Sequence, residues 1–461
     1  MAQGHRLDPT ILREYDIRGI VGDTLTPADV TAIGRAFGSM AVDAGCASVA
    51  VGYDGRLSSP ELEVAVVEGL MSTGLRVVRV GLGPSPMLYF ATHHLDADAG
   101  VMITGSHNPP DYNGLKMVIK GRAFFGDDIQ RLGARAEAGD FHRGAGTESR
   151  HDIAEAYVAR LLRDLDMPDL RVAWDPGNGA AGDIVAAMTA GMPGRHVLIN
   201  ADIDGTFPAH HPDPTVEANL AQLKDLVAAE GCDLGIGFDG DGDRIGVIDA
   251  HGRVLWGDQL LVLLAAEVLA DEPGAIIICD VKGSRVFSDE ITRMGGRPML
   301  WKAGHSHIKA KMAEVGAPLA GEMSAHIFFK HRYYGYDDAL YAAVRLLSAL
   351  KRRGASLAEL YDALPKTVST PEIRFDCAEE RKFAVIEEAR ERLAGADDAE
   401  VLDIDGVRVE TDDGWWLLRA SNTQAALVVR CESATDDGLE RLKAQVAAQL
   451  RASGVEPPAF D

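Results

Sequence analysis

Six consecutive residues, Asp-Gly-Asp-Gly-Asp-Arg at Asp239 to Arg244, carry the strongest chemical signal in this sequence. Unpaired carboxylates this close repel one another, so a bound cation is the usual reason to gather them. The intervening glycines permit backbone conformations closed to other residues, so Asp239, Asp241 and Asp243 can turn toward one point. Because oxygen ligands favour hard ions, we predict one Mg²⁺ per chain here, with Mn²⁺ or Ca²⁺ as alternatives.

An EF-hand and a simple acidic turn are the alternatives to such a site. An EF-hand requires Gly at its sixth position and Glu at its twelfth, where this sequence has Arg244 and Ala250. Asp-Gly pairs are common in turns, but a chance turn seldom aligns three Asp behind an apolar run such as Leu234 to Phe238. A metal site is the better interpretation.

A serine lies in a loop that follows another apolar run. Thr104-Gly105-Ser106-His107-Asn108-Pro109 comes after Val101 to Ile103, and such a loop can present the Ser106 hydroxyl outward. The serine-hydrolase elbow G-x-S-x-G does not fit, because Thr104 and Asn108 occupy the glycine positions. From this segment alone, a turn or helix cap is the alternative.

The segment Gly321 to His326 places a carboxylate, a hydroxyl and an imidazole two residues apart. In a strand, Glu322, Ser324 and His326 point to one face, where they suit a polyhydroxylated ligand. The alternative is the solvated face of an amphipathic strand.

A fourth polar segment, Arg419-Ala420-Ser421-Asn422-Thr423, follows Trp415 to Leu418. Arg offers a planar fork of donors that matches phosphate, and the neighbouring side chains and amides add more donors. We interpret it as a phosphate cradle, with a polar hairpin turn as the alternative. Lys116, Lys282 and His305 stand in Gly-containing loops and can add positive charge.

The overall charge is acidic. The 461 residues include 46 Lys and Arg against 70 Asp and Glu, a formal charge of −24. This balance argues against nucleic acid or an anionic membrane as a partner. Any site for a phosphorylated substrate must therefore be locally basic.

The five cysteines are scattered without a CxxC pair, which fits a reducing cytosol. No apolar signal core begins the chain, and the longest apolar stretch, near Leu260 to Ala270, is too short to span a bilayer. We expect a cytoplasmic protein, a monomer or weak oligomer.

One pattern of strand, Asp, tight turn and helix occurs three times. The aspartates are Asp54, Asp175 and Asp280, which lie 121 (175 − 54) and 105 (280 − 175) residues apart. We interpret the pattern as three related α/β domains in tandem, although unrelated βα units can look alike.

The final segment lacks this pattern and predicts a smaller α+β domain. It contains an expected strand at Glu372 to Phe375 and expected helices at Glu379 to Leu393 and Gly438 to Leu450. The expected domains are residues 1–150, 151–253, 254–366 and 367–461.

In this order, the four polar segments resemble the motifs of the α-D-phosphohexomutases, most closely the bacterial phosphomannomutase/phosphoglucomutase branch. The resemblance runs from about Glu14 to the last helix. It implies three related α/β domains and a smaller C-terminal domain around a central cleft, in agreement with the repeated pattern.

The resemblance implies roles for individual residues. Ser106 would be the phosphoserine, and Asp239, Asp241 and Asp243 would hold Mg²⁺ together with a phosphoserine oxygen. Arg244 would help to orient the metal loop.

The resemblance also assigns the substrate contacts. Glu322 and Ser324 would bind sugar hydroxyls, with His326 near the reacting end. The phosphate that is not reacting would be held by Arg419, Ser421, Asn422 and Thr423. The cleft would further be lined by Tyr15, Arg18, Lys116, Lys282 and His305.

The implied reaction is a phosphoryl exchange on a hexose phosphate. Phospho-Ser106 gives its phosphoryl group to the free hydroxyl, which forms a hexose 1,6-bisphosphate that also serves as activator. This intermediate turns end for end, and its other phosphate returns to Ser106. Mg²⁺ acts as Lewis acid and template. Lys116, Arg18 and His326 are the candidates for proton transfer.

The loop sequences bear on the substrate. Gly-Glu-Met-Ser and Arg-Ala-Ser-Asn-Thr resemble the mannose/glucose enzymes, whereas the glucosamine branch typically has Gln in place of Met323. Ala325 departs from the pattern, because this branch usually has Gly there. We predict interconversion of mannose 6-phosphate and mannose 1-phosphate and of the glucose pair. The alternatives are a phosphoglucosamine mutase, a Mg²⁺ phosphatase and a non-catalytic sugar-phosphate binding protein.

Overall fold

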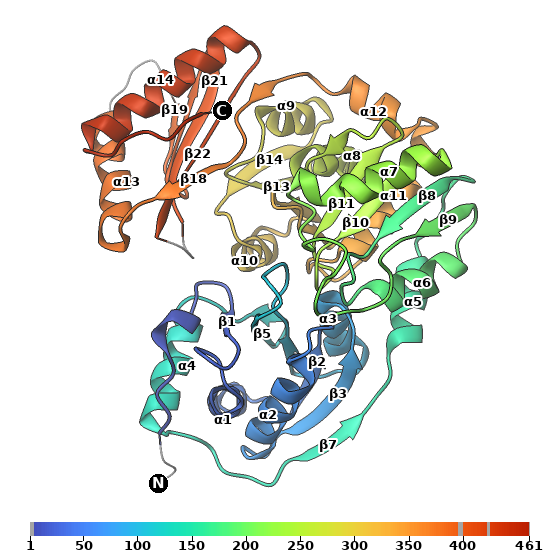
Figure 1. Cartoon of the computed structure of the whole chain (residues 1–461), viewed down its shortest axis with the longest axis vertical. Coiled ribbons are helices and arrows are strands. Elements are labelled where there is room, and N and C mark those ends of the chain that lie inside the picture. The colour runs from blue at the N-terminus through green and yellow to red at the C-terminus, as the bar shows by residue number, and fades with distance from the viewer. Residues whose placement is uncertain (1–3, 395–399, 422–424, 461) are drawn as a thin grey trace.

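The computed structural model describes residues 4–394, 400–421 and 425–460. Four β-sheets follow one another along the chain, and each forms the centre of a domain (Figure 1). The first domain, blue in Figure 1, and the C-terminal domain, red, lie at the two ends of an open arc, with the second and third domains between them. A central cleft receives side chains from all four domains.

The first domain is built on a sheet of order β1-β5-β4-β2-β3-β7, with β6 beside β5. Its central strand, Ser48–Tyr53, is nearly continuous in apolar and small residues, which is typical of a strand covered on both faces. The strands are β1 (Ile17–Ile20), β2 (Ser48–Tyr53), β3 (Arg76–Leu82), β4 (Ala99–Ile103), β5 (Tyr112–Ile119), β6 (Arg122–Ala123) and β7 (Thr147–Arg150). The helices are η1 (Pro9–Ile11), α1 (Pro27–Asp43), α2 (Ser59–Met71), α3 (Ser85–His94) and α4 (Asp127–Ala138).

The second domain has a sheet of order β12-β11-β10-β8-β9. Its strands are β8 (Arg171–Asp175), β9 (Arg195–Leu198), β10 (Leu234–Phe238), β11 (Ile245–Asp249) and β12 (Val254–Leu255). Its helices are α5 (Ala154–Leu162), α6 (Gly182–Ala190), η2 (Glu217–Leu220) and α7 (Ala221–Glu230).

The third domain has a sheet of order β14-β13-β15-β16. Its strands are β13 (Ile276–Asp280), β14 (Arg297–Trp301), β15 (Leu319–Gly321) and β16 (Ile327–Phe329). Its helices are α8 (Gly257–Asp271), α9 (Arg285–Arg293), α10 (His305–Val315), α11 (Ala339–Arg353) and α12 (Leu357–Ala363).

These three sheets share one arrangement. In each, a central strand lies between two parallel neighbours, and the third strand of the unit pairs with an antiparallel fourth. The matching orders are β3-β2-β4-β5, β9-β8-β10-β11 and β14-β13-β15-β16. The prediction of three related α/β domains in tandem is confirmed.

The C-terminal domain is the smaller α+β domain that was predicted. Its antiparallel sheet has the order β17-β22-β21-β20-β19, with β18 beside β22, and α13 and α14 lie along it (Figure 1). The elements are β17 (Val368–Ser369), β18 (Ile373–Asp376), α13 (Glu379–Leu393), β19 (Glu400–Leu402), β20 (Val407–Thr411), β21 (Gly414–Ala420), β22 (Ala426–Ser433) and α14 (Asp436–Ala452).

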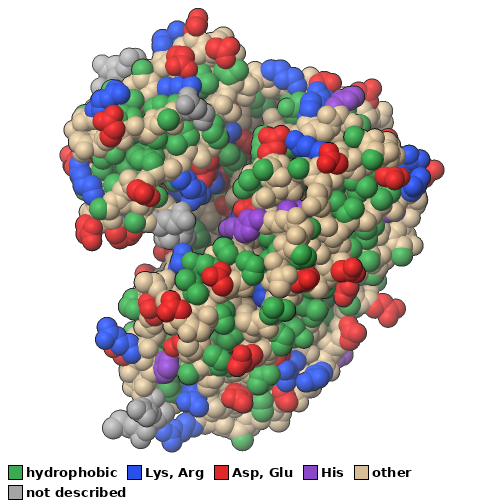
Figure 2. Space-filling model, in the orientation of Figure 1, with side chains coloured by type: hydrophobic (Ala, Val, Ile, Leu, Met, Phe, Trp, Pro, Cys, Tyr) green, Lys and Arg blue, Asp and Glu red, His purple; other side chains and the backbone are tan. Residues whose placement is uncertain are grey.

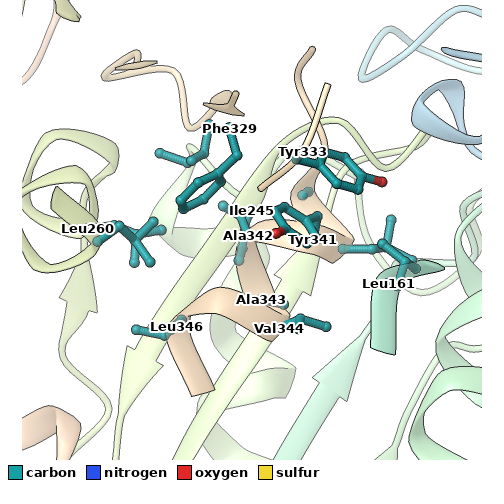
Figure 3. Packing of buried hydrophobic residues seen from close by; sticks show 14 of the residues in the cluster. Leu161, Ile245, Leu260, Phe329, Tyr333, Tyr341, Ala342, Ala343, Val344 and Leu346 are labelled. Atoms are coloured by element: carbon teal, nitrogen blue, oxygen red, sulfur yellow. The ribbon is translucent and has the colours of Figure 1, made fainter. Parts of the chain in front are cut away.

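A buried polar joint connects the second and third domains at the start of α11. Asp338 is 1% exposed and accepts hydrogen bonds from the hydroxyls of Tyr157 and Tyr333 and from the amide of Tyr341. The rings of Tyr333 and Tyr341 are stacked 3.8 Å apart, next to Phe329 and Ile245 in the apolar core (Figure 3). Burial outweighs the three hydrogen bonds and raises the pKa of Asp338 to about 7.

We predict that this carboxyl group makes stability pH-dependent. Its pKa is about 7 when folded, against an ordinary value of 3.8, so the folded state is favoured fully below 3.8 and loses this advantage as pH rises toward 7. Asp338→Asn should therefore gain stability relative to the parent chain between about pH 4 and pH 7. Thermal unfolding of both proteins across this range tests it, and a constant difference at every pH would contradict it.

Candidate active site

The cleft has a volume of about 990 Å³ and is locally basic, as a phosphate site in so acidic a chain requires. Figure 2 shows it as a deep hollow between the first and C-terminal domains, with His, Lys and Arg side chains in its wall. Among the residues that the structure describes, eight Lys and Arg side chains line it against four Asp and Glu. The basic ones are Arg13, Arg18, Lys116, Arg244, Lys282, Arg374, Arg419 and Arg430.

Three of the predicted chemical segments occupy the same position in the repeated fold. Each joins the third strand of its unit to the antiparallel fourth: Ser106 between β4 and β5, Asp239 to Arg244 between β10 and β11, and Glu322 to His326 between β15 and β16. Loops at the carboxyl ends of parallel strands are where α/β sheets bind ligands. The domain packing brings these equivalent loops together.

The Ser106 loop aims its hydroxyl at the second domain. Ser106 has φ +48°, a left-handed conformation that costs a non-glycine residue about 1 kcal/mol. Its amide donates to Oγ1 of Thr104 at 2.8 Å. Its Oγ donates to Oδ2 of Asp239 at 3.0 Å and lies 3.2 Å from Nδ1 of His107. Ser106 is thereby fixed at the edge of the acidic loop.

The acidic loop is closed on itself and buried. Oδ1 of Asp239 accepts the amides of Asp243 and Arg244 at 3.0 and 3.1 Å. Gly242 turns the chain at φ +73°, and a Cβ there would lie 2.9 Å from Pro84. The aspartates at 239, 241 and 243 are 0% exposed, and oxygen atoms from the three lie within 4.8 Å of one another. Burial and the two neighbouring carboxylates raise the pKa of Asp239.

A cation from the first domain sits among these carboxylates. Nζ of Lys116, on β5, donates to Oδ2 of Asp241 at 2.7 Å and to Oδ2 of Asp243. Burial alone would lower the pKa of Lys116, but the two carboxylates outweigh burial and raise it. Within the described residues, Oδ1 of Asp241 is buried without a hydrogen-bond donor, whereas Oδ1 of Asp243 lies 3.2 Å from Nε2 of His326. Buried carboxylate oxygens this close together are suited to a hard divalent ion, so the three aspartates form an acidic cluster that is capable of binding a metal.

The segment Glu322 to His326 is a turn and not the strand that the same-face argument assumed. The Glu322 amide donates to the His326 carbonyl at 2.9 Å, and the Ala325 amide donates to the Glu322 carbonyl at 2.9 Å. The predicted polar side chains still converge, because Nδ1 of His326 lies 3.1 Å from Oε2 of Glu322 and 3.3 Å from Oγ of Ser324. The tight turn therefore brings the three polar side chains closer together than a strand would.

His326 connects this turn to the acidic loop. Its Nε2 lies 3.2 Å from Oδ1 of Asp243. Burial alone would lower the pKa of His326, but Asp243 and Glu322 raise it to about 9. Burial alone would raise the pKa of Glu322, but His326 lowers it to about 2. At neutral pH the pair is therefore an imidazolium and a carboxylate.

The predicted phosphate cradle lies at the end of β21. Arg419 is 5% exposed and forms an ion pair with Asp405 at 3.0 Å, while its Nε has no hydrogen-bond partner among the described residues. Arg419 and Ser421 both line the cleft. Asn422 and Thr423 lie outside the described residues.

Tyr15 and His305 bring the first and third domains together at the cleft. The Tyr15 hydroxyl donates to the Ala303 carbonyl at 2.9 Å. Gly304 has φ +121°, and a Cβ there would lie 2.5 Å from the Tyr15 ring, so only glycine allows this approach. His305 begins α10, and its Nδ1 lies 3.4 Å from Oδ2 of Asp337.

Lys282 stands in the cleft beside the C-terminal domain. Its Nζ lies 3.0 Å from Oε2 of Glu372 and 3.4 Å from Oδ2 of Asp280. Burial alone would lower the pKa of Lys282, but Glu372 and Asp280 raise it, so the side chain stays cationic.

All the predicted substrate and catalytic side chains within the described residues line the cleft. The three aspartates contact two of them, because Asp239 accepts from Ser106 and both Asp241 and Asp243 accept from Lys116. Sequence reasoning missed several other lining residues. His107 follows the serine directly, and the His-Pro-Asp-Pro run at His211 to Pro214 was a visible polar signal. The missed residues are Arg13, Asp16, His107, His211, Asp213, Thr215, Glu372, Arg374 and Arg430.

The sequence matches all four domain descriptions of one family in order. "Phosphoglucomutase/phosphomannomutase, alpha/beta/alpha domain I" matches residues 9–143, domain II residues 155–252, domain III residues 256–368, and the C-terminal domain residues 372–449. The chain belongs to the phosphoglucomutase/phosphomannomutase family.

Relatives match along nearly the whole length. The phosphomannomutase/phosphoglucomutase of Pseudomonas aeruginosa is 45% identical over 98% of this chain and 97% of its own. A phosphoglucomutase of Neisseria gonorrhoeae is 41% identical over 96% of this chain and 97% of its own. The crystal structure of a family protein from Burkholderia thailandensis superimposes with a TM-score of 0.92 at 42% identity, covering 99% of both chains. A search of the described residues finds no helix with the length and apolar character to cross a membrane.

Ala325 has a left-handed backbone with φ +71°, a conformation that favours glycine. It is 6% exposed and closely packed, since a Cβ on Gly257 of α8 would lie 3.1 Å from its amide nitrogen. Alanine tolerates this conformation at a modest cost, but a β-branched side chain does not.

We predict that the stability of variants at position 325 depends on how well each side chain tolerates this left-handed backbone. Ala325→Gly should change the free energy of unfolding by less than about 1 kcal/mol, because relief of strain offsets the added freedom of the unfolded chain. Ala325→Val should lower it by about 2 kcal/mol or more and reduce activity by displacing Glu322 and His326. Urea unfolding of the three proteins provides the measurement, and equal stability of the Val variant would contradict the argument.

Proposed function

We propose that this protein is a Mg²⁺-dependent phosphohexomutase that interconverts the 1- and 6-phosphates of mannose and of glucose. The observation that carries the proposal is the contact of Ser106 with the buried acidic loop, at the floor of a basic cleft lined by all four domains. The names of the Pseudomonas relative, a phosphomannomutase/phosphoglucomutase, and of the Neisseria relative, a phosphoglucomutase, support both sugars.

Ser106 would carry the phosphoryl group. In the forward half-reaction, the bond from phosphorus to the serine oxygen breaks and a bond to the oxygen of the free sugar hydroxyl forms, which gives a hexose 1,6-bisphosphate. The proton that this hydroxyl loses replaces the one that the departing serine oxygen takes up from its proton donor. After the bisphosphate has turned, its other phosphate returns to Ser106 and leaves the isomeric monophosphate. The left-handed backbone and the fixed Oγ of Ser106 support this role, because phosphoryl transfer depends on positioning.

Asp239, Asp241 and Asp243 would hold the Mg²⁺ ion, with an oxygen of phospho-Ser106 as a further ligand. A bound ion would supply Lewis-acid stabilisation of the phosphoryl charge at this point. This assignment draws support from Oδ1 of Asp241, a buried carboxylate oxygen that has no hydrogen-bond donor among the described residues.

Lys116 and His326 are the proposed proton donors. Contacts with buried carboxylates raise the pKa of both side chains, so each holds its proton at neutral pH. Each can protonate the oxygen from which the phosphoryl group departs. Arg18, whose guanidinium donates to the Gly105 carbonyl at 2.9 Å, would stabilise the transferring charge beside Ser106.

The substrate would be held at both ends of the cleft. Arg419 and Ser421, with Asn422 and Thr423 as predicted partners, would bind the phosphate that is not reacting, and Tyr15, Lys282 and His305 would line the path between. The Nε of Arg419, which has no hydrogen-bond partner among the described residues, supports this assignment. Glu322 and Ser324 would bind hydroxyls that mannose and glucose share, which supports acceptance of both.

The decisive experiment supplies purified protein with mannose 1-phosphate, Mg²⁺ and trace hexose 1,6-bisphosphate. Mannose 6-phosphate should form with little free phosphate, and glucose 1-phosphate should also be converted. Ser106→Ala should lower kcat at least about 1,000-fold because the phosphoryl carrier is lost. Ser149→Ala, at an exposed serine on β7, is the matched control. Steady release of phosphate would indicate a phosphatase. A strong preference for glucosamine phosphate would indicate the glucosamine branch, and binding without turnover would indicate a non-catalytic protein.

Mg²⁺ should stabilise the fold as well as support turnover. At 100 times its Kd, the ion should add about 2.7 kcal/mol to the free energy of unfolding. Asp241→Asn should abolish most of this increment, and chelation should stop turnover. Asp249→Asn, at a buried aspartate on β11, tests for a general effect of losing a buried charge. The Mg²⁺-dependent increase in the free energy of unfolding should be lost in Asp241→Asn and kept in Asp249→Asn. The opposite result, with the increase kept in Asp241→Asn and lost in Asp249→Asn, would refute the assignment.

A further inference from the structure

Arg56 lies behind the Ser106 loop and has no place in the cleft itself. It follows β2 in the turn before α2, and its side chain is 0% exposed. Its guanidinium is directed into the space enclosed by the loop from Gly105 to Tyr112.

The two terminal nitrogens of the guanidinium both donate to the backbone of this loop. Nη2 donates to the carbonyls of Ser106 and Asn108 at 2.7 and 2.6 Å. Nη1 donates to the carbonyls of Pro109 and Tyr112 at 2.5 and 2.9 Å. The two terminal nitrogens carry four N–H groups, and four loop carbonyls accept them.

The residues around Arg56 hold its side chain in this position. Asp54, 1% exposed, lies 3.3 Å from its Nε and also accepts the Gly105 amide at 3.1 Å. A Cβ on Gly105 would lie 2.4 Å from the guanidinium carbon, so only glycine leaves room for it. Phe207 of the second domain covers its outer side, with the ring centre 5.1 Å from the guanidinium carbon.

The physical consequence concerns the loop carbonyls. A buried carbonyl without a donor costs about 1–3 kcal/mol, so the buried Ser106 carbonyl depends on the Arg56 guanidinium for its inward-facing geometry, whereas the Pro109 carbonyl also accepts the Tyr112 amide at 3.1 Å. One of the four is the carbonyl of Ser106, whose backbone is left-handed. The guanidinium therefore fixes the peptide that directs the serine Oγ toward Asp239.

We propose that Arg56 is a positioning residue for phosphoryl transfer, holding the Ser106 loop from behind so that Oγ stays aligned with the acidic loop. The inference rests on the proposed mutase function. Arg56 acts through the loop backbone and does not line the cleft, although its charge also interacts with Asp241 of the acidic loop and with Arg18. Its loss should therefore slow the transfer step and leave sugar-phosphate binding intact.

Arg56→Lys is the main test, because lysine keeps the charge but replaces a planar fork with a single ammonium that cannot reach four carbonyls. We expect kcat, and the single-turnover rate of Ser106 phosphorylation by hexose 1,6-bisphosphate, to fall about 100-fold, the effect of a displacement near 1 Å. KM and the Kd for hexose monophosphate should stay within about threefold.

Arg345→Lys is the matched control. Arg345 is also 0% exposed and donates to the His331 carbonyl at 3.0 Å and to Glu267 at 2.7 Å, on α11 away from the cleft. It should lose thermal stability as Arg56→Lys does while keeping kcat within about threefold. The proposal is overturned if both variants lose kcat equally, or if Arg56→Lys raises KM as much as it lowers kcat.

Gly105→Ala gives a second perturbation that leaves residue 56 unsubstituted. Its methyl group would displace the guanidinium, so it should show the same loss of kcat at unchanged KM, and its effect should not add to that of Arg56→Lys. Additive losses would contradict the proposal.

Amide hydrogen exchange separates this inference from the proposed function. The amides of Ser106, Asn108 and Tyr112 are hydrogen-bonded within the loop and should exchange at least about tenfold faster in Arg56→Lys than in Arg345→Lys. If the parent protein shows no mutase turnover, the proposed function fails and exchange alone decides whether Arg56 holds the loop. Unchanged exchange would overturn the inference even in an active enzyme.

Discussion

The burial of three carboxylates at one point is the constraint on which the rest of the structure depends. Asp239, Asp241 and Asp243 are fully buried, and such a cluster is stable only if positive charge offsets its repulsion. Lys116 supplies that charge from the first domain and His326 from the third. The acidic loop of the second domain is thus the centre to which both neighbours are tied, and the packing of three domains follows from its electrostatics.

The apolar core is divided among the domains. One hydrophobic cluster runs through the first three domains and includes Leu88, Trp174 and Leu261, whereas the C-terminal domain has a separate core around Trp416 and Val429. That last domain is held to the third by polar contacts, among them Glu432, which accepts from the Ser284 hydroxyl and the Arg285 amide, and by a small apolar cluster of Val281 with Trp415 and Leu417. The first domain has a further core of its own, which includes Phe37 and Val51, so the shared cluster joins it to the second and third domains along one side only.

The repeated fold explains how one backbone plan supplies three kinds of chemistry. The loop between the third and fourth strands carries a serine in the first domain, carboxylates in the second and a polar turn in the third. Each loop needs its own support because each adopts a strained or crowded backbone, at Ser106, Gly242 and Ala325. In the first domain, the described contacts assign that support to Arg56, a residue without any place in the cleft.

The sequence by itself determined the elements and the chemistry of this protein. Short apolar runs followed by Asp and a turn encode the βα units locally, and Asp239 to Arg244 declare a cation site because so dense a set of carboxylates needs one. The tertiary structure alone decided which atoms meet. Lys116 contacts Asp241 across a separation of 125 residues, Arg56 reaches four carbonyls near Ser106, and Glu322 to His326 form a turn where same-face spacing suggested a strand. Such contacts arise from domain docking and backbone geometry, and neither of these can be predicted from local residue patterns.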